Sequence, residues 1–157
     1  MLYRAIEQNA IPIINYNDAV STEESRRFEI QSLKSKEQHV VECVDNDETA
    51  SQIACLVHAK TLLILTSAEG VYQDSTDPTT LIKEISGKDI YEVLDNITAC
   101  ENYCHGASRA GANGARAKLE YVKEAVKQGT KVIIASAKYS IKDILSGKAN
   151  ATRIGVR

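Results

Sequence analysis

Two short segments of the sequence carry residue types that could bind an anion or an amino acid. The first runs from Gly111 to Gly129 (GANGARAKLEYVKEAVKQG), where two glycines precede a helix-like pattern that carries Lys118. Free backbone N–H groups and the helix dipole make such an N-terminus a latent anion site, and a lysine adds a point charge for phosphate. Glycine-rich segments before ordinary helices are common, however, and this one is neither a Walker A loop nor a G-x-G-x-x-G fingerprint.

The second segment is Asp45-Asn46-Asp47, directly before another helix-like pattern. Aspartate accepts a hydrogen bond from an ammonium group and asparagine binds a carboxylate, so the run could hold an amino-acid zwitterion. The alternative is helix capping, because both residue types accept hydrogen bonds from the free N–H groups of a first turn. One cap needs one such residue and this run has three, and both interpretations stay open.

A third cluster, Cys100, Cys104 and His105, raises the question of a metal. The spacing matches no zinc pattern and a fourth ligand is not evident, so we expect no metal site and interpret the cysteines as incidental thiols. The N-terminal residues show no signal-peptide core, which predicts a cytoplasmic location with reduced thiols.

Composition excludes several classes of partner. The chain has 157 residues, a formal net charge of −2, 43% apolar residues and 5% aromatic residues. This balance gives no electrostatic reason to bind nucleic acid or an anionic membrane, and stacking platforms for single-stranded nucleic acid are scarce. No apolar run is long enough for a membrane span. We therefore expect neither a nucleic acid nor a membrane as partner.

The elements that must position these residues follow from hydrophobic periodicity. We predict one domain over residues 1–157, with a polar, hairpin-like excursion at about 21–44. Continuous apolar runs predict buried strands at 11–14, 62–65 and 132–135. Helical patterns fall at 2–8, 50–57, 90–94, 115–126 and 141–145, and 70–80 and 101–114 read as loops. Strands separated by helices predict an α/β fold, a three-layer αβα sandwich with a mainly parallel sheet.

Polar residues follow each predicted strand, where ligands of open α/β sheets bind. Because loops are polar in most proteins, this pattern has an ordinary explanation as well. The residues concerned are Asn15, Asn17 and Asp18 after the first strand, Thr66, Ser67, Glu69 and Gly70 after the second, and Ser136 and Lys138 after the third.

Taken in order, the segments resemble the C-terminal, nucleotide-binding half of the amino acid kinase family. Within that family the chain is most similar to the glutamate 5-kinases and to the kinase domain of pyrroline-5-carboxylate synthase. The resemblance extends from about Ala10 to Gly155 and implies the family's fold with its N-terminal half missing. The segments that carry it are PIINYNDAVST, VDNDETASQIACLVHAKTLLILTSAEGVYQDSTDP and GARAKLEYVKEAVKQGTKVIIASAKYSIKDILSG.

The resemblance implies transfer of the γ-phosphoryl group of ATP, as its Mg²⁺ complex, to the side-chain carboxylate of glutamate, a step of proline biosynthesis, without a tightly bound cofactor. Asn15, Asp18 and Asn46 would hold glutamate. Asp47 would orient the lysines that stabilise the transferring phosphoryl group, and Lys118 would neutralise charge in the transition state. Phosphoryl transfer depends mainly on positioning and cationic stabilisation, which these residue types supply.

The resemblance also implies a set of nucleotide-binding residues on three separate segments. They are Thr66, Ser67, Tyr72, and the stretch Ala112, Asn113, Gly114 to Lys118.

Departures from the family pattern keep three functional readings open. Residues 1–14 contain no strand with a lysine and a Gly-Ser-Ser turn, and Ser67 stands where the family usually has aspartate. The chain could be part of a kinase, an inactive remnant that binds nucleotide, amino acid or protein, or an unrelated α/β domain with coincidental polar loops. We expect a homo-oligomer, or a partner chain that supplies the missing N-terminal half, because an exposed sheet edge should remain.

Overall fold

The computed structural model of the chain describes residues 2–14, 46–104 and 114–157. The chain forms two compact units, Met1–Thr49 and Ala50–Arg157. Helix α1 (Leu2–Glu7) of the first unit confirms the predicted N-terminal helix. The strand predicted at 11–14 is wrong: within the described residues this segment pairs with no strand, and Ile11 and Ile13 are 90% and 94% exposed. An apolar run becomes a strand only when a neighbouring backbone pairs with it.

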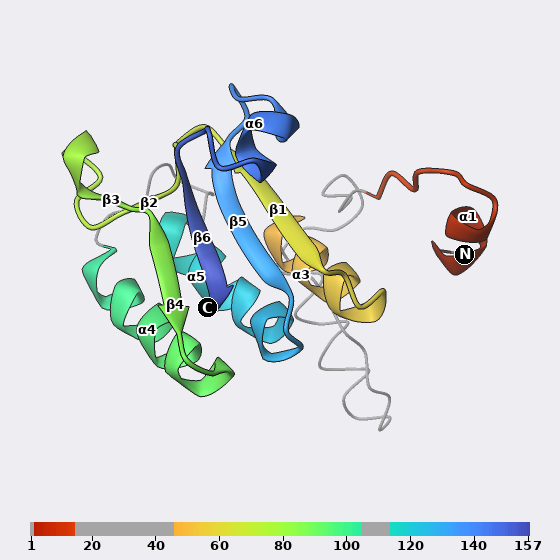
Figure 1. Cartoon of the computed structure of the whole chain (residues 1–157), viewed down its shortest axis with the longest axis horizontal. Helices are drawn as coiled ribbons and strands as arrows, with labels where there is room; N and C mark the ends of the chain where they lie inside the picture. The colour runs from red at the N-terminus through yellow and green to blue at the C-terminus, as the bar shows by residue number, and fades with distance from the viewer. Residues whose placement is uncertain (1, 15–45, 105–113) are drawn as a thin grey trace, which may run out of the picture. The chain divides into compact units, whose positions relative to one another are not determined.

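The second unit is built on a four-stranded sheet with the strand order β1-β5-β6-β4 (Figure 1). The β1–β5 and β4–β6 pairs are parallel, whereas β5 and β6 are antiparallel. The mainly parallel sheet confirms the predicted fold class, and the short, half-polar β4 is a strand that the apolar pattern missed. The bounds are β1 (Thr61–Thr66), β4 (Glu84–Gly87), β5 (Lys131–Ser136) and β6 (Ala151–Val156).

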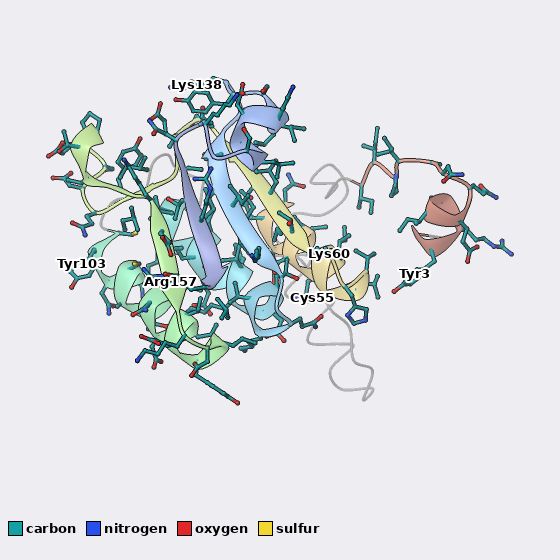
Figure 2. All side chains as sticks on the ribbon, viewed as in Figure 1. Tyr3, Cys55, Lys60, Tyr103, Lys138 and Arg157 are labelled. Carbon is teal, nitrogen blue, oxygen red and sulfur yellow. The ribbon has the colours of Figure 1, made fainter. Side chains whose placement is uncertain are left out.

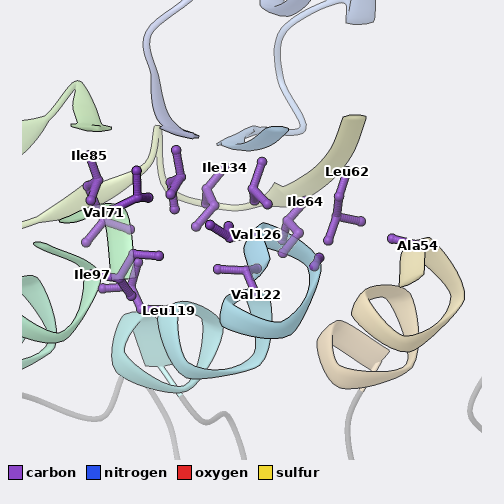
Figure 3. Close-up of a cluster of buried hydrophobic side chains, with 14 of the residues drawn as sticks. Ala54, Leu62, Ile64, Val71, Ile85, Ile97, Leu119, Val122, Val126 and Ile134 are labelled. Carbon is purple, nitrogen blue, oxygen red and sulfur yellow. The ribbon is translucent and has the colours of Figure 1, made fainter. Parts of the chain in front are cut away.

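Helices lie on both faces of this sheet. A large hydrophobic core lies between one face of the sheet and three helices (Figure 3). These helices are α3 (Asn46–Leu56), α4 (Ile90–Tyr103) and α5 (Gly114–Lys127). The short α6 (Ile141–Leu145) packs Ile144 in a smaller cluster with Ala135 and Ala151. The large core contains Ala54, Cys55, Leu62, Ile64, Val71, Ile85, Val93, Ile97, Leu119, Val122, Ala125, Val126, Val132, Ile134 and Ile154.

Helix α4 is longer than its sequence pattern predicts. It continues through residues 101–103, which we predicted as loop, because Val93, Ile97 and Glu101 recur on one buried face. The glutamate interrupts the apolar pattern, yet it is only 8% exposed and pairs with Lys123 of α5 at 2.9 Å. The ion pair joins α4 to its neighbour α5.

Helix α5 ends as the sequence predicts. Gly129 has a φ of +83°, a conformation that costs glycine little. Its N–H donates to the Val126 carbonyl at 2.9 Å, and the Thr130 N–H donates to the Ala125 carbonyl at 3.1 Å. This pair of bonds is a Schellman motif, which ends the helix and leads the chain directly into β5.

Candidate functional site

One end of the sheet gathers the loops that could form a site. The parallel strands β1 and β5 both end there, and the antiparallel β6 begins there. The two strand ends are joined by a hydrogen bond of 2.9 Å from the Ala137 N–H to the Thr66 carbonyl. The loop after β1, the turn after β5 and the loop before β6 therefore come together at what we call the carboxyl edge, where open α/β sheets bind ligands.

Glu69 is the centre of a polar network at the carboxyl edge. Its Oε1 accepts hydrogen bonds from Lys138 Nζ at 2.5 Å and from the Tyr139 hydroxyl at 2.6 Å. Its Oε2 accepts one from Asn150 Nδ2 at 2.8 Å. Lys138, labelled in Figure 2, lies at this end of the sheet, and its ammonium group also lies 4.8 Å from the centre of the Tyr139 ring. One carboxylate thus ties the loop after β1 to the turn after β5 and to the loop before β6.

The network keeps Glu69 ionised. Hydrogen bonds from Lys138, Tyr139 and Asn150 lower the pKa of its carboxyl group from 4.5 to about 2. The same contacts raise the pKa of the Lys138 ammonium group and that of the Tyr139 hydroxyl. Through the neutral pH range the Lys138 ammonium group and the Tyr139 hydroxyl therefore stay protonated as donors, and the Glu69 carboxylate stays ionised as their acceptor.

Acid should remove the contribution of this network to stability. A carboxyl group with a lowered pKa stabilises the folded state above its ordinary pKa and loses that effect as pH falls toward the folded value. We expect the difference in unfolding free energy between the parent and Glu69→Gln to be constant above about pH 5 and to shrink between pH 4.5 and about 2. Urea denaturation across this range measures it, and a difference independent of pH would contradict the assignment.

A second set of contacts holds the segment that follows Glu69. Strand β2 (Val71–Tyr72) pairs antiparallel with β3 (Leu81–Ile82), the latter preceded by the 3₁₀ turn η1 (Pro78–Thr80). The fully buried Thr152 hydroxyl accepts from the Val71 N–H at 2.8 Å and donates to the Ile82 carbonyl at 2.6 Å. The predicted loop at 70–80 therefore contains a strand, which a β6 side chain fixes to the main sheet.

Close packing at the same point requires a residue without a side chain. A Cβ on Gly70 would lie 2.5 Å from Thr152 Oγ1 and 2.9 Å from the Thr152 backbone nitrogen. Because a backbone atom cannot move aside, only glycine allows this approach of the loop to β6.

Helix α5 presents its N-terminus toward the carboxyl edge. It leads through a tight turn into β5 and packs against that strand, so it runs in the opposite direction and starts where β5 ends (Figure 1). Gly114, with a φ of +56°, opens the helix, and Lys118 lies one turn later. The first turn contains no acidic residue. The backbone N–H groups of a helix start whose first turn holds no acidic residue favour an anion.

The structure places part of the predicted site. Thr66 and Ser67 lie at the end of β1 and Tyr72 lies in β2, so these nucleotide candidates belong to the same edge. Asn46 and Asp47 lie in the first turn of α3, in the other compact unit. Four predicted residues lie outside the described residues: Asn15, Asp18, Ala112 and Asn113.

Three residues of the carboxyl edge escaped the sequence analysis: Tyr139, Asn150 and Thr152. Glu69 and Lys138 were visible as polar residues after neighbouring strands. Asn150 had no comparable signal, because it precedes a strand whose antiparallel direction the sequence does not reveal.

Among residues 2–14, 46–104 and 114–157, no group of three or more histidine, cysteine or acidic side chains is arranged to hold a metal, and His105 lies outside them. Burial raises the pKa of both the Cys100 and the Cys104 thiol. In the same described part of the chain, no helix is long and apolar enough to cross a membrane.

Comparison with known proteins identifies the class. The model of the amino acid kinase family matches residues 2–136, so the chain belongs to the amino acid kinase family. Glutamate 5-kinase from Clostridium perfringens is 31% identical over 145 residues, and glutamate 5-kinase from Dehalococcoides mccartyi is 34% identical over 161 residues. These alignments include 91% and 99% of this chain.

A solved structure supports the same fold. Carbamate kinase from Giardia lamblia, bound to AMP-PNP, superposes with a TM-score of 0.55 at 21% sequence identity. The match includes 99% of this chain and 55% of that protein. The chain likewise spans about half or less of its glutamate 5-kinase relatives, 48% for the Clostridium protein and 37% for the Dehalococcoides protein.

Proposed function

We propose that the chain forms the nucleotide-binding part of a glutamate 5-kinase-type phosphotransferase. The observation that carries the proposal is the start of α5, which has no acidic residue in its first turn, carries Lys118 one turn later, and faces the edge that also holds Thr66, Ser67 and Tyr72. Similarity to glutamate 5-kinases supports the choice of acceptor. The nucleotide is ATP with Mg²⁺, which acts as substrate, and the acceptor is the side-chain carboxylate of glutamate.

The proposed reaction needs no general base on the protein. A carboxylate oxygen of glutamate forms a bond to the γ-phosphorus of ATP, and the bond from that phosphorus to the β–γ bridging oxygen breaks, which yields an acyl phosphate and ADP. Because the carboxylate is already ionised at neutral pH, no proton has to leave. Lys118 and the N–H groups at the start of α5 stabilise charge on the phosphates.

The remaining assignments belong to the same proposal. Asn15, Asp18 and Asn46 bind glutamate, and Asp47 orients lysines around the transferring group. Ala112, Asn113 and Gly114 bind the phosphates of the nucleotide together with Lys118. We further propose a cytoplasmic protein that acts as a homo-oligomer or with a chain that supplies the N-terminal half of the family's domain. The exposed Leu65 on the edge strand β1 supports this association, since β1 pairs only with β5 among the described strands.

A calorimetric titration with Mg²⁺–AMP-PNP, with and without glutamate, tests the proposal. We expect the 157-residue chain to bind the nucleotide and to bind it more tightly when glutamate is present. Lys118→Ala should weaken nucleotide binding about 10- to 100-fold, because a hydrogen bond to a charged group contributes about 1.5–3 kcal/mol.

The matched control is Lys127→Ala, which removes a lysine from the last turn of the same helix, where it pairs with Glu124. This variant should bind the nucleotide like the parent. Absence of heat in both titrations of the parent would overturn the proposal. Binding of nucleotide without any effect of glutamate would favour the inactive, nucleotide-binding alternative, which the serine at position 67 also favours.

A further inference from the structure

Glu69 accepts more side-chain hydrogen bonds than its contribution to stability explains. Lys138 and Glu69 side chains are 57% and 25% exposed, and an ion pair at such exposure adds little to global stability. Yet the carboxylate accepts three hydrogen bonds from residues 69 to 81 positions away in the sequence. A network of this kind defines the relative position of loops more than it stabilises the core.

The loop that Glu69 fixes is the one with the nucleotide candidates. Ser67 lies two residues before it, and Tyr72 lies three residues after it. The far end of this loop is already held, because the Val71 N–H donates to the buried Thr152 hydroxyl. The near end is held by a hydrogen bond that the Ala137 N–H donates to the Thr66 carbonyl. Glu69 is the side chain that anchors the middle.

We propose that Glu69 is the positioning residue of the nucleotide loop, residues 66–72. Its carboxylate locks this loop to Lys138 and Tyr139 after β5 and to Asn150 before β6, so that the loop is ordered before the nucleotide arrives. The inference rests on the proposed function, because it assigns the loop to nucleotide binding. Without the lock, binding must order the loop itself, and affinity falls by the cost of that ordering.

Glu69→Gln is the informative substitution. Its amide NH₂ group cannot accept a hydrogen bond, so it cannot accept both from Asn150 on one side and from Lys138 and Tyr139 on the other. The matched control is Glu124→Gln, the same change in an exposed ion pair with Lys127 within one helix. We expect Glu69→Gln to weaken Mg²⁺–AMP-PNP binding about three- to tenfold near neutral pH, under conditions where the variant is fully folded, and Glu124→Gln to bind the nucleotide like the parent.

A double-mutant cycle separates positioning from a general loss of charge. If Glu69 acts through Lys138, then Lys138→Met alone should also weaken nucleotide binding, and Glu69→Gln combined with Lys138→Met should bind the nucleotide about as weakly as Glu69→Gln alone. Equal affinity of Glu69→Gln and the parent would overturn the inference. A fully additive double mutant would overturn it as well.

Hydrogen exchange gives a readout that does not depend on nucleotide binding. Amides of residues 66–72 should exchange faster in Glu69→Gln than in the parent or in Glu124→Gln, while amides of α5 should exchange alike in all three. A parent that binds no nucleotide would refute the proposed function, and the exchange rates would still decide whether Glu69 orders the loop. Unchanged exchange in this loop would overturn the inference.

Discussion

Replacing Leu119 with alanine is expected to lower the free energy of unfolding by about 2–5 kcal/mol. Leu119 lies on the buried face of α5, is 0% exposed, and belongs to the core between that helix and the sheet (Figure 3). Removing its side chain forfeits the transfer free energy of the lost methyl groups and leaves a cavity in a closely packed layer. Urea denaturation of the whole chain measures the loss.

The control for this change is Leu145→Ala in α6, where the leucine is 57% exposed. It should change the free energy of unfolding by no more than about 0.5 kcal/mol, as is usual for surface positions. If Leu119→Ala cost no more than Leu145→Ala, the assignment of Leu119 to the core would be wrong.

Thr152→Val should lower the free energy of unfolding by about 2–4 kcal/mol. The valine has almost the same shape, but it neither accepts from the Val71 N–H nor donates to the Ile82 carbonyl. Val71 is 1% exposed, so its N–H would stay buried without an acceptor, and each such unsatisfied group costs about 1–3 kcal/mol. The β2–β3 pair would also lose its attachment to β6.

Thr152→Ser serves as the matched variant because it keeps the hydroxyl group and removes only a methyl group. Its expected cost is about 0.5–1.5 kcal/mol, the range for deletion of one buried methyl group. Chemical denaturation of both variants separates the contribution of the two hydrogen bonds from that of the packed methyl group. If serine and valine destabilised the protein equally, packing of the methyl group and not the hydrogen bonds would account for the role of Thr152.

Local sequence patterns predicted the strands and the helix that have a clear run or stripe of buried apolar residues. The apolar runs at 62–65 and 132–135 became β1 and β5, and the stripe of α5 placed Leu119, Val122 and Val126 in the core. The strand runs are apolar at successive positions, which is typical of strands covered on both faces of a sheet. The α5 stripe recurs with the helical period because one face of the helix is buried. The run at 11–14 failed because an apolar run by itself does not create a pairing partner.

The sequence by itself determined the family, the fold class and the position of the candidate residues at element ends. Thr66 and Ser67 had to follow a strand and Lys118 had to lie near the start of a helix, since these positions depend only on neighbours in the chain. The segments of the sequence in their order also sufficed to identify a member of the amino acid kinase family, which the family match confirms.

Only the tertiary structure decided which of these residues meet. Asn150 reaches Glu69 because β6 runs antiparallel to β5 and therefore begins at the edge where β1 and β5 end. Thr152 holds Val71 from 81 positions away for the same reason. Contacts at such separations depend on strand order and direction, which are set by packing of the whole sheet and leave no trace in the local periodicity.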